Sequence, residues 1–202
     1  MTNTATHTDP RPLYRDALTW VSELIDEVAA DQLTLPTPCT EFDVRRLLGH
    51  LVATVERARV IGAGGEPATI PLVLTDIPDD GYGNAYRAAT DRMWSVWNDD
   101  TLLDTEVTPP WGAVPGRGAI GGYLNETLVH GWDLAVATGQ NAEAAPELAE
   151  AALSMARAMI PASPRGGDFI PFDEVVESSV DAGPTERLAN WSGHSRKTSP
   201  GQ

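Results

Sequence analysis

The chain is poor in cysteine and in basic residues, and both shortages narrow its possible roles. Cys39 is the single cysteine among 202 residues, so no internal disulfide can form. This fits a reducing compartment, and we expect a cytoplasmic protein. Only 14 residues are lysine or arginine against 29 aspartates and glutamates, which gives a formal net charge of −15. Such an acidic surface repels nucleic acids and anionic membranes, so we expect neither as a partner.

Long hydrophobic runs are also missing. No stretch reaches the roughly 18 uncharged apolar residues that a membrane-spanning helix requires. The N-terminal residues lack the basic and then apolar composition of a signal peptide. The hydrophobic share of 42% is nevertheless enough for a sizeable core. The length suits one domain, with or without an appendage.

Apolar residues recur at three- and four-residue steps through most of the chain, as in amphipathic helices. Prolines and glycines separate these segments. The pattern predicts helices over about residues 12–30, 41–61, 82–98, 119–138, 143–160 and 184–191. Thr40 is expected to cap the second helix, and Gly139 to end the fourth. At most a short strand is expected, at residues 104–108.

These elements predict an all-α protein. Residues 66–80 form a long, proline-containing connection, which suits a crossover between helices of a bundle. We assign residues 12–160 to the bundle and residues 161–202 to a C-terminal extension that is partly disordered. His7 and His194 lie in polar terminal segments and are expected to be solvated.

Three ionisable side chains inside apolar segments are the strongest functional signal. Glu126 and His130 are four residues apart and share one face of a predicted helix, while His50 lies in the apolar run 47–52 of another. A buried carboxylate is costly unless it is paired or binds a cation. Two imidazoles and one carboxylate are typical ligands of a divalent metal with an open coordination position. On spacing alone, an ordinary Glu–His hydrogen bond and a core histidine bonded to a backbone carbonyl are the more common explanations.

Two segments resemble the mycothiol-dependent maleylpyruvate isomerase N-terminal family, which belongs to the DinB-like group of metal-binding bundles. They are residues 36–52, which lead into the second predicted helix, and residues 123–135. The resemblance implies a DinB-like four-helix bundle of up-down-down-up order with a long crossover. It also implies a divalent metal ion, zinc or nickel, bound by His50, Glu126 and His130.

The resemblance further implies a partner for the metal. A low-molecular-weight thiol such as mycothiol would bind it and attack a small electrophile, in a transfer or isomerisation reaction. The stretch after residue 160 is too short to replace the second domain of the isomerase, so the exact reaction stays open. The alternative is a non-catalytic metal-binding module, for which a homodimer is one conceivable form.

Four further residues near the two motifs carry weaker signals. Cys39 precedes a predicted helix, where a thiolate would be stabilised, although packing in the loop is the plainer role. Asp133, one turn after His130, is a candidate for orienting a ligand, and Asn125 is a weaker one. Phe42 stands where the family commonly has tryptophan, a difference that we expect to affect the entry into the helix rather than the ligands.

Overall fold

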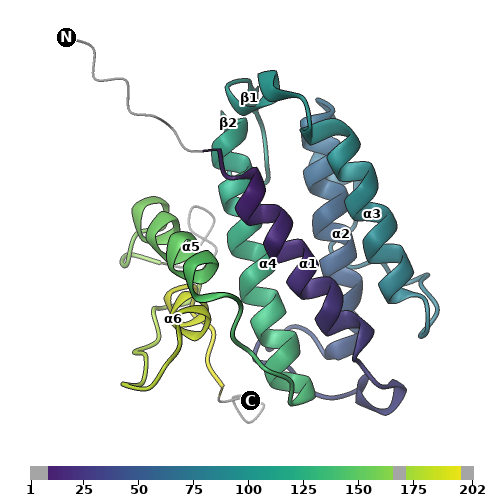
Figure 1. Cartoon of the computed structure of the whole chain (residues 1–202), viewed down its shortest axis with the longest axis vertical. Helices are drawn as coiled ribbons and strands as arrows, with labels where there is room; N and C mark the ends of the chain where they lie inside the picture. The colour runs from purple at the N-terminus through teal and green to yellow at the C-terminus, as the bar shows by residue number, and fades with distance from the viewer. Residues whose placement is uncertain (1–8, 166–171, 197–202) are drawn as a thin grey trace.

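The computed structural model describes residues 9–165 and 172–196 and confirms the predicted all-α class (Figure 1). Within these residues the α-helices are α1 (Arg11–Asp26), α2 (Val44–Gly62), α3 (Tyr82–Trp97), α4 (Gly116–Thr138), α5 (Pro146–Met159) and α6 (Pro184–Trp191). Short 3-10 helices lie at Ala30–Gln32, Pro67–Thr69 and Asp100–Leu103. The strands β1 (Glu106–Val107) and β2 (Val114–Pro115) form one small antiparallel hairpin, near the predicted strand at 104–108.

The helices α1 to α4 form a bundle in the expected up-down-down-up order (Figure 1). α1 packs beside α4, and α2 packs beside both α3 and α4. α2 and α3 run in the same direction, so the chain has to return along the bundle between them. Residues 63–81 make this return, which is the predicted crossover.

Large buried side chains fill the bundle, and α4 is its central helix. Residues on every side of α4 are buried, as expected for a helix that is apolar around most of its circumference. Gly131 allows α1 to approach closely, because a Cβ atom there would lie 2.5 Å from the ring of Trp20. On the other side of the bundle, the indole N–H of Trp97 donates to the carbonyl of Ala58 at 2.7 Å.

Four helix boundaries differ from the prediction by three or four residues. α4 begins at Gly116 instead of about 119, and α5 begins at Pro146 instead of about 143. The other two, in α1 and α2, have clear local reasons. α1 ends four residues early because Gln32 organises the following turn, and its side-chain amide donates to the carbonyl of Thr138 at 3.0 Å. α2 begins at Val44 because Asp43, not Thr40, is the capping residue. The Asp43 carboxylate accepts a hydrogen bond from the backbone N–H of Arg46 at 2.8 Å. α4 ends as predicted, since Gly139 follows it with a left-handed φ of 73°.

The helices α5 and α6 pack against each other and against α4, outside the four-helix bundle (Figure 1). The carboxylate of Glu143 accepts hydrogen bonds from the first backbone N–H groups of α6, at Thr185 (2.9 Å) and Glu186 (3.2 Å). Leu188 and Ala189 of α6 are fully buried. The helix α6 of the C-terminal extension is therefore packed onto α4, whereas the division at residue 160 stays a prediction. No helix in the described ranges is both long and apolar enough to cross a bilayer.

Candidate functional site

The contact between α2 and α4 brings the three predicted residues together. Nε2 of His50, from α2, lies 3.9 Å from Oε2 of Glu126. Nε2 of His130, one turn further along α4, lies 3.5 Å from the same oxygen. The two imidazole rings meet edge to face, with centroids 4.7 Å apart. Both imidazoles thus face one carboxylate oxygen.

The three side chains differ in exposure. His50 and His130 are buried, with exposed fractions of 5% and 8%. The side chain of Glu126 is 31% exposed, so the group is reached from solvent on the Glu126 side. The site is therefore buried around the rings and partly exposed along the Glu126 side chain.

Each imidazole is oriented by a hydrogen bond at Nδ1, the ring nitrogen that points away from Glu126. Nδ1 of His50 lies 2.9 Å from the carbonyl oxygen of Leu72, which can only accept, so Nδ1 is the donor. Nδ1 of His130 lies 2.9 Å from Oδ2 of Asp133, in agreement with the orienting role suggested for that residue. In a neutral imidazole, a proton on Nδ1 leaves a lone pair on Nε2. In that neutral tautomer each Nε2 would present its lone pair on the Glu126 side, as metal binding requires. Without a metal, the raised pKa of His130 makes it an imidazolium whose Nε2–H donates to Glu126.

Burial and pairing act against each other in setting the charges. Burial acts to raise the pKa of Glu126, but hydrogen bonds to His130 and His50 outweigh it and hold that pKa well below its usual range. Burial acts to lower the pKa of His130, but Asp133 and Glu126 outweigh it and raise the pKa to about 10. The pKa of His50 is lowered, chiefly by burial. His130 therefore lies between two carboxylates, those of Glu126 and Asp133, and this negative charge favours a cation at the site.

The donor set and its spacing fit a divalent metal ion. Two ligands about 2.0–2.1 Å from a tetrahedral zinc ion lie about 3.3 Å from each other. The distances of 3.5 and 3.9 Å from the imidazoles to Glu126 are close to this value. Two imidazoles and one carboxylate would occupy three of four positions. The fourth could then be taken by water or by a thiolate.

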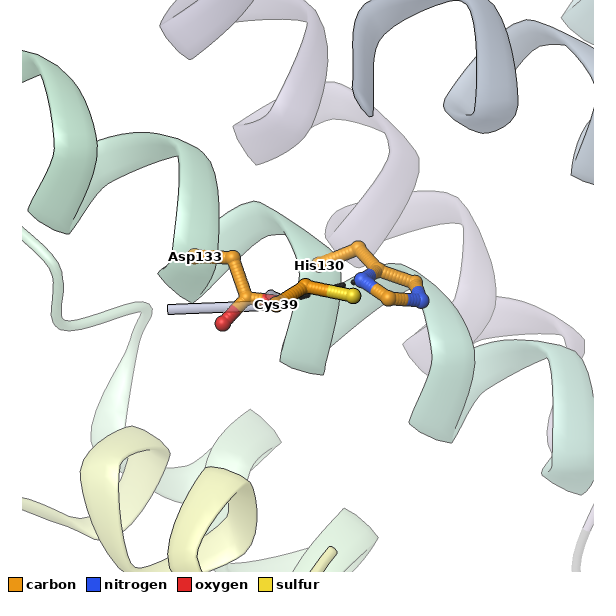
Figure 2. A group of neighbouring side chains, drawn as sticks. All are labelled: Cys39, His130 and Asp133. Carbon is orange, nitrogen blue, oxygen red and sulfur yellow. Dashed lines mark hydrogen bonds and ion pairs between the residues drawn. The ribbon is translucent and has the colours of Figure 1, made fainter. Parts of the chain in front are cut away.

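A second group of potential ligand atoms adjoins the first. Figure 2 shows Cys39 beside His130 and Asp133, and the three offer atoms within 4.8 Å of one another. Burial, together with the charge of Asp133, raises the pKa of Cys39 to about 12. Cys39 is thus a neutral thiol near pH 7. The suggestion that a helix N-terminus would stabilise its thiolate is wrong, because burial dominates, and loop packing is the role that fits.

Two residues lie closer to the site than expected. His194 is not solvated, because its Nδ1 lies 2.9 Å from Asp133. A histidine in a polar tail gave no sequence signal for this contact. Phe42 contacts the imidazoles, with its ring centroid 4.9 Å from that of His50, so the difference at this position touches the two histidine rings as well as the helix entry. His7 lies outside the described residues, and Asn125 is buried.

Comparisons with known proteins point to one family for this chain. The model of the family described as the mycothiol maleylpyruvate isomerase N-terminal domain matches residues 14–135, a range that contains all three site residues. Two proteins from two strains of Mycobacterium tuberculosis, both described only as uncharacterized, are 32% identical to the chain over 185 residues. The alignment covers 92% of this chain and 97% of each relative, so it continues past the family match. No solved structure matches the chain.

Proposed function

Since the chain belongs to the mycothiol maleylpyruvate isomerase N-terminal domain family, we propose that it is a divalent-metal-dependent enzyme that uses a low-molecular-weight thiol. His50, Glu126 and His130 are the proposed ligands, and zinc or nickel is the proposed metal. The observation that carries the proposal is that two imidazoles present Nε2 to one Glu126 oxygen, while a carbonyl and a carboxylate engage both Nδ1 atoms. Outer partners of this kind typically fix the tautomer of metal-binding histidines.

A bound divalent ion deprotonates a coordinated thiol, which makes it a nucleophile at neutral pH. The residues of this chain supply the surroundings for that chemistry. The buried rings of His50 and His130, covered by Phe42, exclude water from one side. The exposed side of Glu126 gives a small thiol and a small electrophile access from the other.

The thiol is best supplied by a small molecule rather than by the protein. Cys39 is the single cysteine, and its raised pKa keeps it protonated. A protonated thiol is a poor nucleophile. We therefore propose mycothiol, or a thiol like it, as the sulfur donor for a transfer or isomerisation reaction.

Metal analysis of the purified protein tests the proposal directly. The wild-type chain should hold about one zinc or nickel ion, the stoichiometry of a single three-ligand site. H130A and E126Q should lose most of it, whereas E23Q, which alters an exposed carboxylate of α1, should keep it. Unchanged metal content and thermal stability in H130A would contradict the proposed site.

A thermal-shift series with small thiols distinguishes the enzyme from a non-catalytic metal-binding module. A thiol that binds the folded metal-loaded protein should raise its melting temperature with concentration. The metal-free protein should show no such shift. A metal-loaded protein that responds to no thiol and turns over no electrophile would favour the module instead.

A further inference from the structure

The segment after α6 reaches the carboxylate that orients His130. Nδ1 of His194 lies 2.9 Å from both Oδ1 and Oδ2 of Asp133. The His194 ring also meets the His130 ring edge to face, with centroids 5.6 Å apart. Asp133 is wholly buried, and the two imidazoles contact it from two different parts of the chain. A residue 61 positions away thereby completes the surroundings of a proposed metal ligand.

The end of α6 is shaped to present His194. The backbone N–H of His194 donates to the carbonyl of Ala189 at 2.9 Å. The side-chain amide of Asn190 donates to the carbonyl of His194, also at 2.9 Å. Gly193 makes the turn with a φ of +96°, a conformation that disfavours other residues. A Cβ atom at Gly193 would also lie 2.7 Å from Asp173. The turn therefore holds His194 in a defined place.

A buried carboxylate requires donors for its oxygens, and the arrangement of those donors sets its orientation. With His194 bound to both oxygens, Asp133 is held so that Oδ2 stays on Nδ1 of His130. Without that donor, the carboxylate has less compensation for its charge and is free to turn. His130 would then lose the contact that directs its Nε2 towards Glu126.

We propose that His194 is a positioning residue, which acts through Asp133 to fix the ring orientation of His130. This inference rests on the proposed function for the metal, but the geometry of His130 can be tested with or without an ion. Cys39, although near, is a poorer candidate for this role, because the described contacts of Asp133 already involve His130 and His194.

The experiment compares three substitutions in the full-length protein. H194L removes the donor. H194N keeps an N–H at the position of Nδ1. R196Q removes the ion pair of the same segment with Glu186 and the stacking of Arg196 on Trp132, but leaves His194 in place. Zinc affinity is measured by competition with a chelator, and ligand geometry by the visible spectrum of the cobalt(II) form.

We expect H194L to weaken zinc binding roughly 3–10-fold, less than the 10–100-fold typical of a direct outer partner, and to change the cobalt spectrum. H194N should restore both to near the wild-type result, and R196Q should leave both unchanged. Wild-type affinity and spectrum in H194L would overturn the inference. A loss in H194L that R196Q matches would overturn it as well, because the effect would then be general to the segment.

A second measurement separates this inference from the proposed function. In the metal-free protein, the Nδ1 proton of His130 should give a slowly exchanging NMR signal because Asp133 binds it. H194L should broaden or shift that signal, and H194N should preserve it. If the wild-type protein binds no zinc, the proposed function fails, yet this signal still decides the role of His194. An unchanged His130 signal in H194L would refute that role, even in a protein that binds zinc.

Discussion

His130 and Asp133 form a buried pair within one turn of α4, with Nδ1 2.9 Å from Oδ2. D133N keeps the size of the side chain but offers an amide in place of a carboxylate. Because the amide is a weaker acceptor and can also donate, the His130 tautomer with a free Nε2 should be less favoured. We expect zinc affinity to fall roughly 10–100-fold, as measured by chelator competition.

The control for D133N is D16N, which makes the same change at an exposed position of α1. It should leave zinc affinity unchanged. Equal zinc affinity in D133N and D16N would show that Asp133 does not act on His130.

Residue Leu72 of the crossover does for His50 what Asp133 does for His130: its carbonyl oxygen accepts a hydrogen bond from Nδ1. Arg57 donates to the carbonyl oxygens of Ile70 (3.3 Å) and Pro71 (2.6 Å), and the next carbonyl, that of Leu72, binds His50. R57M keeps the apolar stem and removes the donors. We expect faster hydrogen exchange in the crossover and a several-fold loss of zinc affinity, smaller than for a direct partner of a ligand.

R45M is the matched control for this contact. Arg45 also joins α2 to the crossover, through an ion pair with Asp79, but further from Leu72. The R45M substitution should loosen the crossover near Asp79 without changing the zinc affinity. If R45M and R57M affect zinc binding equally, general loosening rather than the placement of Leu72 is the cause.

The close approach of α1 and α4 next to His130 depends on Gly131. In G131A the added Cβ atom would lie 2.5 Å from Trp20 and 2.7 Å from Val21, so the helices would have to separate. We expect a loss of about 1–3 kcal/mol in the free energy of unfolding, the usual cost of overpacking, measured by urea denaturation.

Gly121, nearly three turns earlier on α4, provides the contrast. In G121A the added Cβ atom would meet nothing closer than the sulfur of Met159 at 3.9 Å. Alanine favours the helix over glycine by up to about 1 kcal/mol, so G121A should be neutral or stabilising. A G131A protein as stable as G121A would mean that the α1–α4 contact tolerates the extra atom.

The sequence predicted what depends on periodicity and local turn chemistry. The spacing of apolar residues located the helices, and Glu126 and His130 had to share a face because they are four residues apart. The cap at Asp43 was missed by three residues, because Thr40 and Asp43 are both acceptable capping residues and the packing of the preceding loop selects one. Periodicity could not show the distance between His50 and Glu126, since it is set by the packing of two helices.

His194 shows a different limit of the sequence. Its neighbours are polar, and no pattern within its own segment points to a buried partner. Its position depends on how Glu143 fixes the start of α6 and how Gly193 turns the chain after it. Such a contact arises only when several separate local structures are assembled in space.

Glu56 joins α2 to α3 away from the site. Its side chain is 10% exposed and forms ion pairs with Arg59 at 2.7 Å and with Arg92 at 2.5 Å. Burial acts to raise the pKa of Glu56, but the hydrogen bonds from both arginines outweigh it, and the pKa is lowered. The ionised carboxylate is therefore favoured more in the folded than in the unfolded chain.

The sign of the pH dependence follows from that lowered pKa. The stabilisation from Glu56 is fully present above its unfolded pKa, close to 4.5, and is lost as the pH falls through the lower folded value. We expect E56Q to reduce the free energy of unfolding by roughly 1–2 kcal/mol at pH 7. This is below the full scale of hydrogen bonds to charged groups, because both arginines are partly exposed to solvent. Urea denaturation at several pH values should show this difference from wild type shrinking below about pH 4.5. E150Q, at an exposed position of α5, should match wild type throughout. A difference for E56Q that stays constant down to pH 3 would place its cause in packing rather than in the charge of Glu56.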